Sequence, residues 1–509
     1  MTTKIEPLAP PPLLTPAEER FERARRTISL FAGPALFALI LALPMPGLTP
    51  PQHRLTAVLL WVLTYWIGEA IPIPATALLG PVLCVLMGIA EPTAVFAPFA
   101  NPIVFLFLGS FILAEGMITH RLNERIALTV LSARWLVARG RRLALAVGLI
   151  PLMISMWISD SATTAMIYPI LLGILATLRT SEGGRQGRRF EAGLLLTISY
   201  AALIGGVGTP VGTPPNLIGI GMLDKLAGVH IQFFQWMLLA VPTLLVLAVC
   251  MFAYMGAIFP SPKIDGSSIA TYVRGQRREL GAWSRGEKNT LAAFLIAVVL
   301  WVFPGIAASI SGPQSDLFKF CERHIPEGVA SLVAALLLFF LPTDWKARRF
   351  TLRWSDALRI DWGTILLFGG GLSLGSLMFS TGLADVFGRS VIAFSGVSSM
   401  WGLTAIAIAL AILLTEMTSN TATASMLVPV VIALAKSMVV SPVPPVIGVC
   451  LGASMAFMLP VSTPSNAIVY GSGRVPITSM IRAGVALDVK SFAVIFGMLR
   501  LLCPALGLI

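Results

Sequence analysis

Long apolar stretches alternate with short polar or basic segments along most of the chain. Stretches of this length and composition are typical of helices that cross a lipid bilayer. The pattern predicts eleven spans and two further apolar segments, each interrupted by a polar phrase, which fold as re-entrant helical hairpins. The predicted spans cover residues 28–43, 55–69, 73–90, 102–120, 191–223, 234–259, 288–307, 328–342, 362–380, 444–470 and 484–508. The predicted hairpins cover residues 143–178 and 400–437.

Three short sequences of the first half return in the second half, in the same order. The phrase Ser159-Asp160-Ser161 at the first hairpin tip returns as Ser419-Asn420-Thr421 at the second. Two spans are predicted to be broken, the fifth at residues 205–216 and the tenth at residues 460–466, and their breaks also match: Gly212-Thr213-Pro214-Pro215-Asn216 returns as Ser462-Thr463-Pro464-Ser465-Asn466. A weaker match joins residues 109–122 and 370–383. Polar breaks at corresponding positions of two halves are typical of transporters.

The distribution of basic residues predicts the orientation of the spans. With the N-terminus inside and each hairpin returning to its own side, most Lys and Arg residues fall in inside loops, as the positive-inside rule requires. The outside then holds only Arg54, Lys225, Lys319, Arg323, Arg389 and Lys436, and the C-terminus lies outside. Each repeat contains five crossings, and an odd number inverts the second copy relative to the first. The two tips are therefore predicted to approach the middle of the bilayer from opposite faces.

Composition excludes several other classes of protein. The 509 residues are 56% hydrophobic and 12% charged, about half the charged fraction of a soluble domain. The net charge of +12 lies in short loops, which indicates membrane orientation and not nucleic-acid binding. Five scattered cysteines show neither metal-ligand spacing nor a disulfide framework. We expect no cleavable signal peptide, since no small-residue cleavage site follows a short apolar core.

The four polar breaks carry the candidate chemistry. Where a helix ends, its last carbonyl groups lack partners, and together with hydroxyl groups they suit a hard cation such as Na⁺. Where a helix begins, free N–H groups and the positive end of the dipole suit a carboxylate or another oxyanion. Two tips and two Thr-Pro breaks thus predict one anion site flanked by two cation sites. The alternative is that each break is a packing kink whose hydroxyls bond to their own helix.

These motifs resemble the divalent anion/Na⁺ symporter family of dicarboxylate, citrate and sulfate carriers. The resemblance covers nearly the whole chain after the N-terminal tail. It rests on the two tips, on Trp66-Ile67-Gly68-Glu69-Ala70-Ile71-Pro72-Ile73-Pro74 and on the Ser462-Thr463-Pro464-Ser465-Asn466-Ala467 turn. It implies a homodimer in which a mobile transport domain carries the site across the membrane past a fixed scaffold, by an elevator motion.

The resemblance also implies a division of the chain. Residues 1–27 form a cytoplasmic tail and 260–287 a cytoplasmic loop. Residues 28–142 and 288–399 are mainly scaffold, with amphipathic arms in the basic segment before the first hairpin and at 383–395. Residues 143–259 and 400–509, which hold the hairpins and broken spans, form the transport domain.

Site residues follow from the same resemblance, position by position. The first cation site would use Ser155, Ser159, Asp160 and Gly212, and the second Thr415, Thr418, Asn420 and Ser462. The substrate would meet Ser159, Asp160, Ser161, Thr213, Pro214, Ser419, Asn420, Thr421, Thr463 and Pro464. Glu416, beside the second tip, either orients that tip or has a structural role.

Asp160 departs from the family pattern, which has Asn at this position. An ionised Asp only accepts hydrogen bonds and places a negative charge near a doubly negative substrate. Like charges about 6 Å apart repel by about 3 kcal/mol at an effective dielectric constant near 20. Asp160 is therefore expected to be offset by a bound cation or to be protonated. Three outcomes remain open: a tighter first cation site, proton coupling, or altered coupling such as exchange without cation dependence. Ser161 also departs, replacing Thr, which slightly enlarges the pocket.

The expected function is secondary active transport of small dicarboxylates of the succinate, malate and fumarate class, coupled to Na⁺ or H⁺. A sulfate or citrate carrier and a cation-independent dicarboxylate exchanger are the rivals within transport. An enzyme is not expected, because no nucleophile, base or metal cluster is visible. A sensor is not expected either, because the tail and the loop are too short to signal. ATP-driven transport is not expected, because the sequence contains no P-loop motif. The expected location is a bacterial inner membrane.

Overall fold

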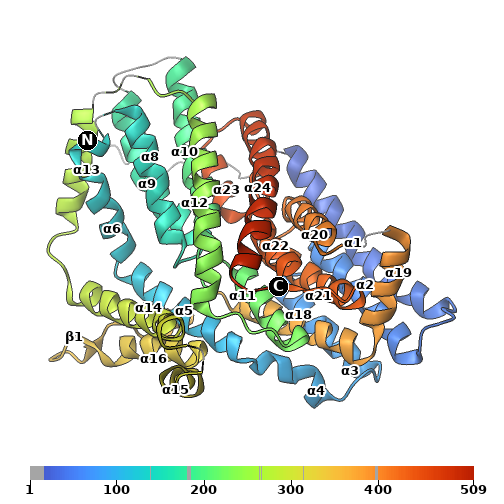
Figure 1. Cartoon of the computed structure of the whole chain (residues 1–509). Helices are drawn as coiled ribbons and strands as arrows, with labels where there is room; N and C mark the ends of the chain where they lie inside the picture. The colour runs from blue at the N-terminus through green and yellow to red at the C-terminus, as the bar shows by residue number, and fades with distance from the viewer. Residues whose placement is uncertain are drawn as a thin grey trace.

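The computed structural model describes residues 16–137, 139–179, 185–262, 264, 266–312, 314–395 and 399–509. The described chain is almost entirely helical (Figure 1), which confirms the predicted helical membrane fold at this level. Two short antiparallel strands, β1 (Pro342–Asp344) and β2 (Arg349–Phe350), are an exception that the sequence did not predict. Residues 1–15 of the expected tail lie outside the described residues, and the tail is already helical from Pro16.

The first half runs from α1 to η2. Its helices are α1 (Pro16–Ala42), α2 (Pro50–Gly68), α3 (Ile73–Leu86), α4 (Pro92–Phe96), η1 (Ala97–Ala100), α5 (Pro102–Thr119), α6 (Leu122–Leu131), α7 (Arg134–Val137), α8 (Gly140–Ser155), α9 (Asp160–Arg179), α10 (Arg185–Gly206), α11 (Pro214–Met222) and η2 (Leu223–Ala227). Many of them begin with proline, which fits the first helical turn because the missing N–H would have no partner there.

The second part runs from α12 to the C-terminus. Its helices are α12 (Phe233–Ile258), α13 (Gly266–Glu279), α14 (Arg285–Ser311), α15 (Asp316–His324), α16 (Glu327–Phe340), α17 (Trp354–Ala357), α18 (Trp362–Ser380), α19 (Leu383–Ser395), α20 (Met400–Thr415), α21 (Asn420–Ser437), α22 (Val443–Ala453), α23 (Pro464–Tyr470) and α24 (Ile477–Ala505).

One predicted loop contains a helix, and one predicted break has different bounds. The loop predicted at 260–287 contains α13, a helix that buries Ile269, Ala270 and Val273. The break predicted at 460–466 is longer, because α22 ends at Ala453 and α23 begins only at Pro464. Residues 263 and 265 of the predicted loop lie outside the described residues.

Length and hydropathy alone do not fix the number of crossings. Among the described residues, seven helices are long and apolar enough to cross a membrane, or up to eight if α15 and α16, bent by 62°, form one span. Several predicted spans, such as α3 and α22, are shorter apolar helices. The eleven crossings therefore stay a prediction.

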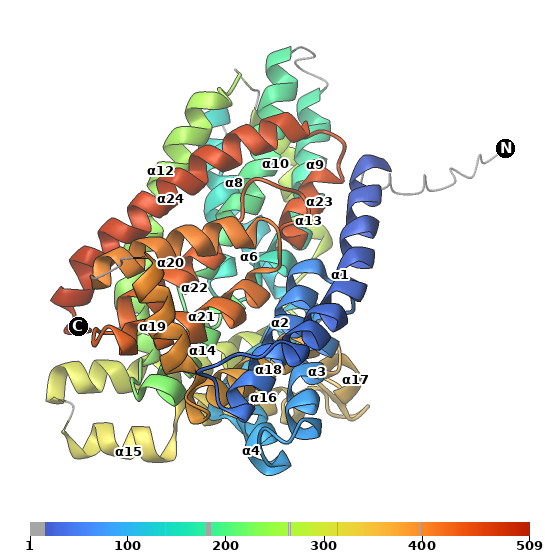
Figure 2. The same ribbon diagram turned by 90° about the vertical axis from the view of Figure 1, so that its right-hand side faces the viewer.

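The hairpins and broken helices pack into one another across the two halves. In Figure 1, α8, α10 and α12 lie side by side, while α1, α2 and α3 gather at the other end of the molecule. In Figure 2, α24 runs alongside α20 and α22. Helix α9 of the first hairpin packs against α23, and α21 of the second hairpin packs against α11. Each hairpin thus contacts the broken helix of the other half.

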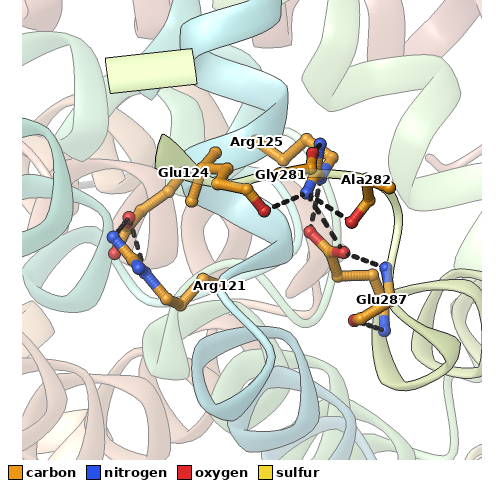
Figure 3. A network of polar contacts seen from close by, with 8 residues as sticks. Arg121, Glu124, Arg125, Gly281, Ala282 and Glu287 are labelled. Atoms are coloured by element: carbon orange, nitrogen blue, oxygen red, sulfur yellow. Dashed lines mark hydrogen bonds and ion pairs between the residues drawn. The ribbon is translucent and has the colours of Figure 1, made fainter. Parts of the chain in front are cut away.

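A buried ion pair fixes α6 beside the start of α14 (Figure 3). The Arg125 guanidinium bonds to Glu287 and also donates to the carbonyl oxygens of Gly281 (3.1 Å) and Leu280 (3.1 Å). Both charged side chains are about 95% buried, with exposures of 6% and 5%. Buried charges are stable only when they are paired and hydrogen-bonded, as they are here. Because these bonds join α6 to the loop between α13 and α14, they fix the position of α6 relative to that loop.

Candidate binding site

Both hairpin tips are built in the same way. Helix α8 ends at Ser155 and α9 begins at Asp160, and the Ser159 hydroxyl accepts a hydrogen bond from the Ala162 amide at 3.3 Å. At the second tip, the Ser419 hydroxyl accepts from the Ala422 amide at 3.2 Å. Serine is a preferred residue at this capping position because its oxygen satisfies an N–H that has no partner within the helix. Both tips are only partly buried, so the first turns of α9 and α21 are accessible.

The two broken helices are also built alike. The Asn216 amide group donates to the carbonyl oxygens of Gly206 (3.2 Å) and Thr209 (2.8 Å). The Asn466 amide donates to those of Ala456 (2.8 Å) and Leu459 (3.0 Å), at the equivalent positions of the second repeat. Each asparagine therefore holds the irregular segment that precedes its own helix, and the predicted correspondence extends to individual bonds.

Thr213 and Thr463 stand in extended conformation immediately before the prolines that open α11 and α23. Both threonines are 4% exposed. Each broken helix thus restarts at a Thr-Pro step, with the N-terminal end of α11 or α23 following directly. These ends carry the positive pole of the helix dipole, the feature predicted to bind an anion.

The first predicted cation set surrounds Gly212. A Cβ atom on this glycine would lie 2.5 Å from the Gly206 carbonyl oxygen, 2.7 Å from that of Met156 and 2.8 Å from that of Ser155. The Ser155 hydroxyl is fully buried and has no hydrogen-bond partner. Three backbone carbonyl oxygens thus crowd around Gly212, and Ser155, which supplies one of them, also carries the unpartnered hydroxyl. Carbonyl and hydroxyl oxygens are the hard donors that Na⁺ prefers. The residues of this set therefore fit a cation.

Asp160, a member of the same predicted set, adds a carboxyl group at the start of α9. Its Oδ1 accepts hydrogen bonds from the Ser161 amide (2.8 Å) and the Ser161 hydroxyl (3.3 Å). The predicted departures at 160 and 161 are thus in contact with each other.

The second predicted cation set holds more acceptor oxygens than protons. The Thr415 hydroxyl lies 2.7 Å from Asn420 Oδ1 and 2.6 Å from the Ala453 carbonyl oxygen, although it has a single proton. The Ser462 hydroxyl lies 2.8 Å from both Glu416 Oε2 and the Leu459 carbonyl oxygen. Such clusters of oxygen atoms suit a cation.

Thr418, the remaining residue of the second predicted cation set, forms a hydrogen bond with another hydroxyl group. The Thr418 hydroxyl pairs with that of Thr423 at 2.9 Å. At the first tip, Ile158 stands at the position of Thr418, and the Thr163 hydroxyl, which is equivalent to that of Thr423, has no partner. The two cation sets are therefore similar in plan but not in detail.

A cavity of about 570 Å³ lies beside the first hairpin. It is bounded by α6, α9 and α13 and reaches Ala162, two residues from Asp160. Arg121 and Glu124 line its wall. The hydrogen bond between them (Figure 3) raises the pKa of Arg121. Arg121 therefore keeps its positive charge beside a space that leads toward the first tip.

Comparison with known proteins identifies the family. The family model for the sodium:sulfate symporter transmembrane region matches residues 24–509. The chain belongs to this symporter family. It is an integral membrane transport protein and not an enzyme, as predicted from its sequence.

Named relatives of this symporter family match over most of their length. A sodium-dependent dicarboxylate transporter, SdcS, of Staphylococcus saprophyticus is 34% identical over 498 residues, which cover 96% of this chain and 93% of the relative. SdcS of Staphylococcus aureus USA300 is 33% identical over 483 residues, with coverages of 93% and 90%. Neisseria gonorrhoeae MtrF, described as one of a class of antimetabolite efflux pumps, shares the fold with a TM-score of 0.55 and 12% identity. That comparison covers 91% of this chain and 96% of MtrF.

In this member of the symporter family, sequence reasoning singled out Glu416 near the second tip but missed two other polar residues, Asp488 and Ser465. Glu416 is 1% exposed and accepts hydrogen bonds from the amides of Met458 (2.8 Å) and Leu459 (3.2 Å). Asp488 on α24 lies beside Glu416. Ser465 lies beside Asp160. Only Glu416 carried a signal in the sequence, as an acid next to a tip, because the other two neighbours meet through tertiary packing.

Proposed function

We propose that this symporter-family protein is a secondary active transporter of small dicarboxylates of the succinate, malate and fumarate class, coupled to Na⁺. The observation that carries the proposal is the equivalent construction of two capped hairpin tips and two asparagine-held broken helices. A ligand with a carboxylate at each end suits two such anion-binding ends. The sodium-dependent dicarboxylate transporters that this chain resembles along nearly its whole length support both the substrate class and the ion.

In this proposal the substrate carboxylates meet the two tips and the two Thr-Pro steps. The residues are Ser159, Asp160, Ser161, Thr213 and Pro214 from the first half and Ser419, Asn420, Thr421, Thr463 and Pro464 from the second. The first Na⁺ is held by Ser155, Ser159, Asp160 and Gly212. The second is held by Thr415, Thr418, Asn420 and Ser462. Bound Na⁺ supplies positive charge next to the substrate, so that substrate and cation stabilise each other at the site.

The proposed mechanism moves the site and not the substrate alone. The two repeats have inverted topology, and the hairpins are re-entrant, so that the tips meet from opposite sides. Residues 143–259 and 400–509 form the moving part, and residues 28–142 and 288–399 form a scaffold through which two copies associate. The contacts of α9 with α23 and of α21 with α11 support this division, because they bind the two halves of the site to each other.

The proposed location is a bacterial inner membrane, with the N-terminus in the cytoplasm and the C-terminus outside. The excess of basic residues in the loops assigned to the inside supports this orientation.

Asp160 keeps a second candidate open, a transporter with altered coupling. A carboxylate in the first site either binds the cation more tightly or carries a proton. The third alternative is that this site does not depend on a cation, as in a dicarboxylate exchanger.

Uptake by the purified protein in liposomes tests the proposal. Radiolabelled succinate is offered with an inward Na⁺ gradient, with an inward proton gradient, or with internal succinate and no gradient. We expect accumulation with the Na⁺ gradient, and competition by malate and fumarate but not by sulfate. Uptake that needs only internal succinate would establish exchange. For Asp160→Asn we expect altered dependence on pH and Na⁺; dependence identical to the wild type would exclude a coupling role for Asp160.

A further inference from the structure

Ser465 on α23 occupies a special place in the second repeat. It stands between Pro464 and Asn466, where the first repeat has Pro215. Proline has no hydroxyl group, so only the second repeat carries an oxygen at this position. Ser465 belongs to none of the predicted binding sets.

The Ser465 hydroxyl is fully buried and makes no hydrogen bond of regular geometry among the described residues. Leaving a buried hydroxyl unpaired costs about 1–3 kcal/mol. A buried hydroxyl of this kind is therefore expected to have a hydrogen-bond partner or a ligand, and the neighbouring helix α9 carries a candidate partner.

That neighbour is Asp160. Helix α9 packs against α23, and across this contact the Ser465 hydroxyl comes close enough to the Asp160 carboxyl group to interact with it. The hydrogen bonds from the Ser161 amide and hydroxyl go to Oδ1 of Asp160. Neither of these two bonds involves Oδ2 of Asp160.

The equivalent pair of positions, where α21 packs against α11, has neither a carboxyl group nor a side-chain hydroxyl. Asn420 stands where Asp160 does and carries a neutral amide, and Pro215 stands where Ser465 does. Asn420 is instead engaged within its own hairpin by Thr415. The carboxylate and the unpaired hydroxyl are thus both present where α9 packs against α23 and are both missing where α21 packs against α11.

We propose that Ser465 and Asp160 act as one pair of oxygen donors in the first cation site, so that this site draws a ligand from each repeat. A carboxylate, a hydroxyl and the carbonyl oxygens around Gly212 are all hard donors of the kind that Na⁺ selects. This inference rests on the proposed Na⁺ coupling and deepens it, because it assigns the departure at residue 160 to the cation and gives it a specific partner.

A consequence is that the two cation sites respond differently to loss of a hydroxyl. Removing Ser465 weakens the first site through Asp160 and leaves the second site, on Thr415 and Asn420, unaffected. Because the two donors act together, the effect of removing Ser465 depends on whether the carboxylate is present.

A double-mutant cycle on the purified full-length protein tests the proposal. Wild type, Ser465→Ala, Asp160→Asn and the double variant are titrated with NaCl at constant ionic strength, without substrate, and the Na⁺-dependent rise in melting temperature is measured. The same four proteins are then assayed for Na⁺-dependent succinate uptake in liposomes. Ser425→Ala is the matched control, since its hydroxyl is also buried and unpartnered but faces Gly371 on α18.

We expect Ser465→Ala to raise the Na⁺ concentration for half-maximal stabilisation about threefold to tenfold. In the Asp160→Asn background the same substitution should change it less than about twofold, and Ser425→Ala should leave it unchanged. Equal effects of Ser465→Ala in both backgrounds, or no effect in the wild type, would overturn the pairing. If the wild type itself shows neither Na⁺-dependent stabilisation nor Na⁺-driven uptake, the proposed function fails instead.

Discussion

The hydroxyl of Ser199 on α10 donates a hydrogen bond of 2.6 Å to Oδ1 of Asn466 on α23. Both residues are fully buried, so the bond joins the two broken helices inside the protein. The equivalent oxygen in the first repeat, Oδ1 of Asn216, has no partner, because Val449 stands where Ser199 would be. The asparagine of the second break is therefore tied to the first half, whereas the Asn216 side chain bonds, among the described residues, only within its own segment.

Ser199→Ala should destabilise the second break. The substitution leaves Oδ1 of Asn466 buried and unpaired, at a cost of about 1–3 kcal/mol. We expect a lower melting temperature in detergent and a higher Na⁺ requirement for uptake. Thr197→Val is the control, because its hydroxyl bonds only to the Gly193 carbonyl of its own helix. If the two variants lose the same stability, the bond across the repeats has no special role.

Gly212→Ala should abolish the first cation site. The new methyl group would lie 2.5–2.8 Å from three carbonyl oxygens, a distance that forces the backbone apart. Overpacking of this kind costs about 1–3 kcal/mol, and the displaced oxygens are those proposed to hold Na⁺. We expect uptake to fall more than tenfold while folded protein is still recovered. Gly256→Ala on α12, where a Cβ meets nothing within 4 Å, should transport normally. Normal uptake by Gly212→Ala would place the cation elsewhere.

Glu416→Gln should weaken the second cation site. Glutamine keeps one acceptor oxygen, so it cannot accept from both the Met458 and the Leu459 amides as the carboxylate does. Hydrogen bonds to a charged group are worth about 1.5–3 kcal/mol, which predicts about a tenfold or greater rise in the Na⁺ concentration for half-maximal uptake. The control is Glu115→Gln on α5, another buried glutamate, which bonds to Thr119. An unchanged Na⁺ requirement would make the role of Glu416 purely structural.

Arg25→Gln should loosen the second hairpin tip. Arg25 on α1 donates to the Met417 carbonyl oxygen at 2.9 Å and is itself held by Glu22 at 2.7 Å. We expect a cysteine at position 417, introduced by Met417→Cys, to react several times faster with a membrane-impermeant maleimide once Arg25 is replaced. Arg26→Gln serves as the control, since its side chain is 58% exposed and makes only longer contacts, of 3.6 Å and 4.0 Å, to acids. Identical labelling rates in the two variants would contradict the contact.

Local sequence predicted the helix starts well. Ser159 and Ser419 cap their helices, the Thr-Pro steps open α11 and α23, and α19 spans the predicted 383–395 segment. These features depend on residues close in the chain, which a single sequence contains. The family was also recognised correctly, because its motifs are long and contiguous.

Contacts between distant segments could not be predicted in the same way. The length of the break before α23 depends on Asn466, whose side-chain amide donates hydrogen bonds to the carbonyl oxygens of Ala456 and Leu459 within the break. The pairing of Ser199 with Asn466 and the approach of Ser465 to Asp160 join residues hundreds of positions apart. No periodicity or motif encodes such pairs, so they appear only once the halves are packed together.

The most direct test of Na⁺-coupled dicarboxylate transport is the reversal of net flux. Liposomes containing the protein are loaded with a fixed succinate gradient, and the opposing Na⁺ gradient is varied at a clamped membrane potential until net succinate movement stops. Coupled transport predicts that the balance point shifts with the Na⁺ gradient, by a factor set by the number of Na⁺ ions moved per succinate. A balance point that follows the succinate gradient alone, whatever the Na⁺ gradient, would contradict the account.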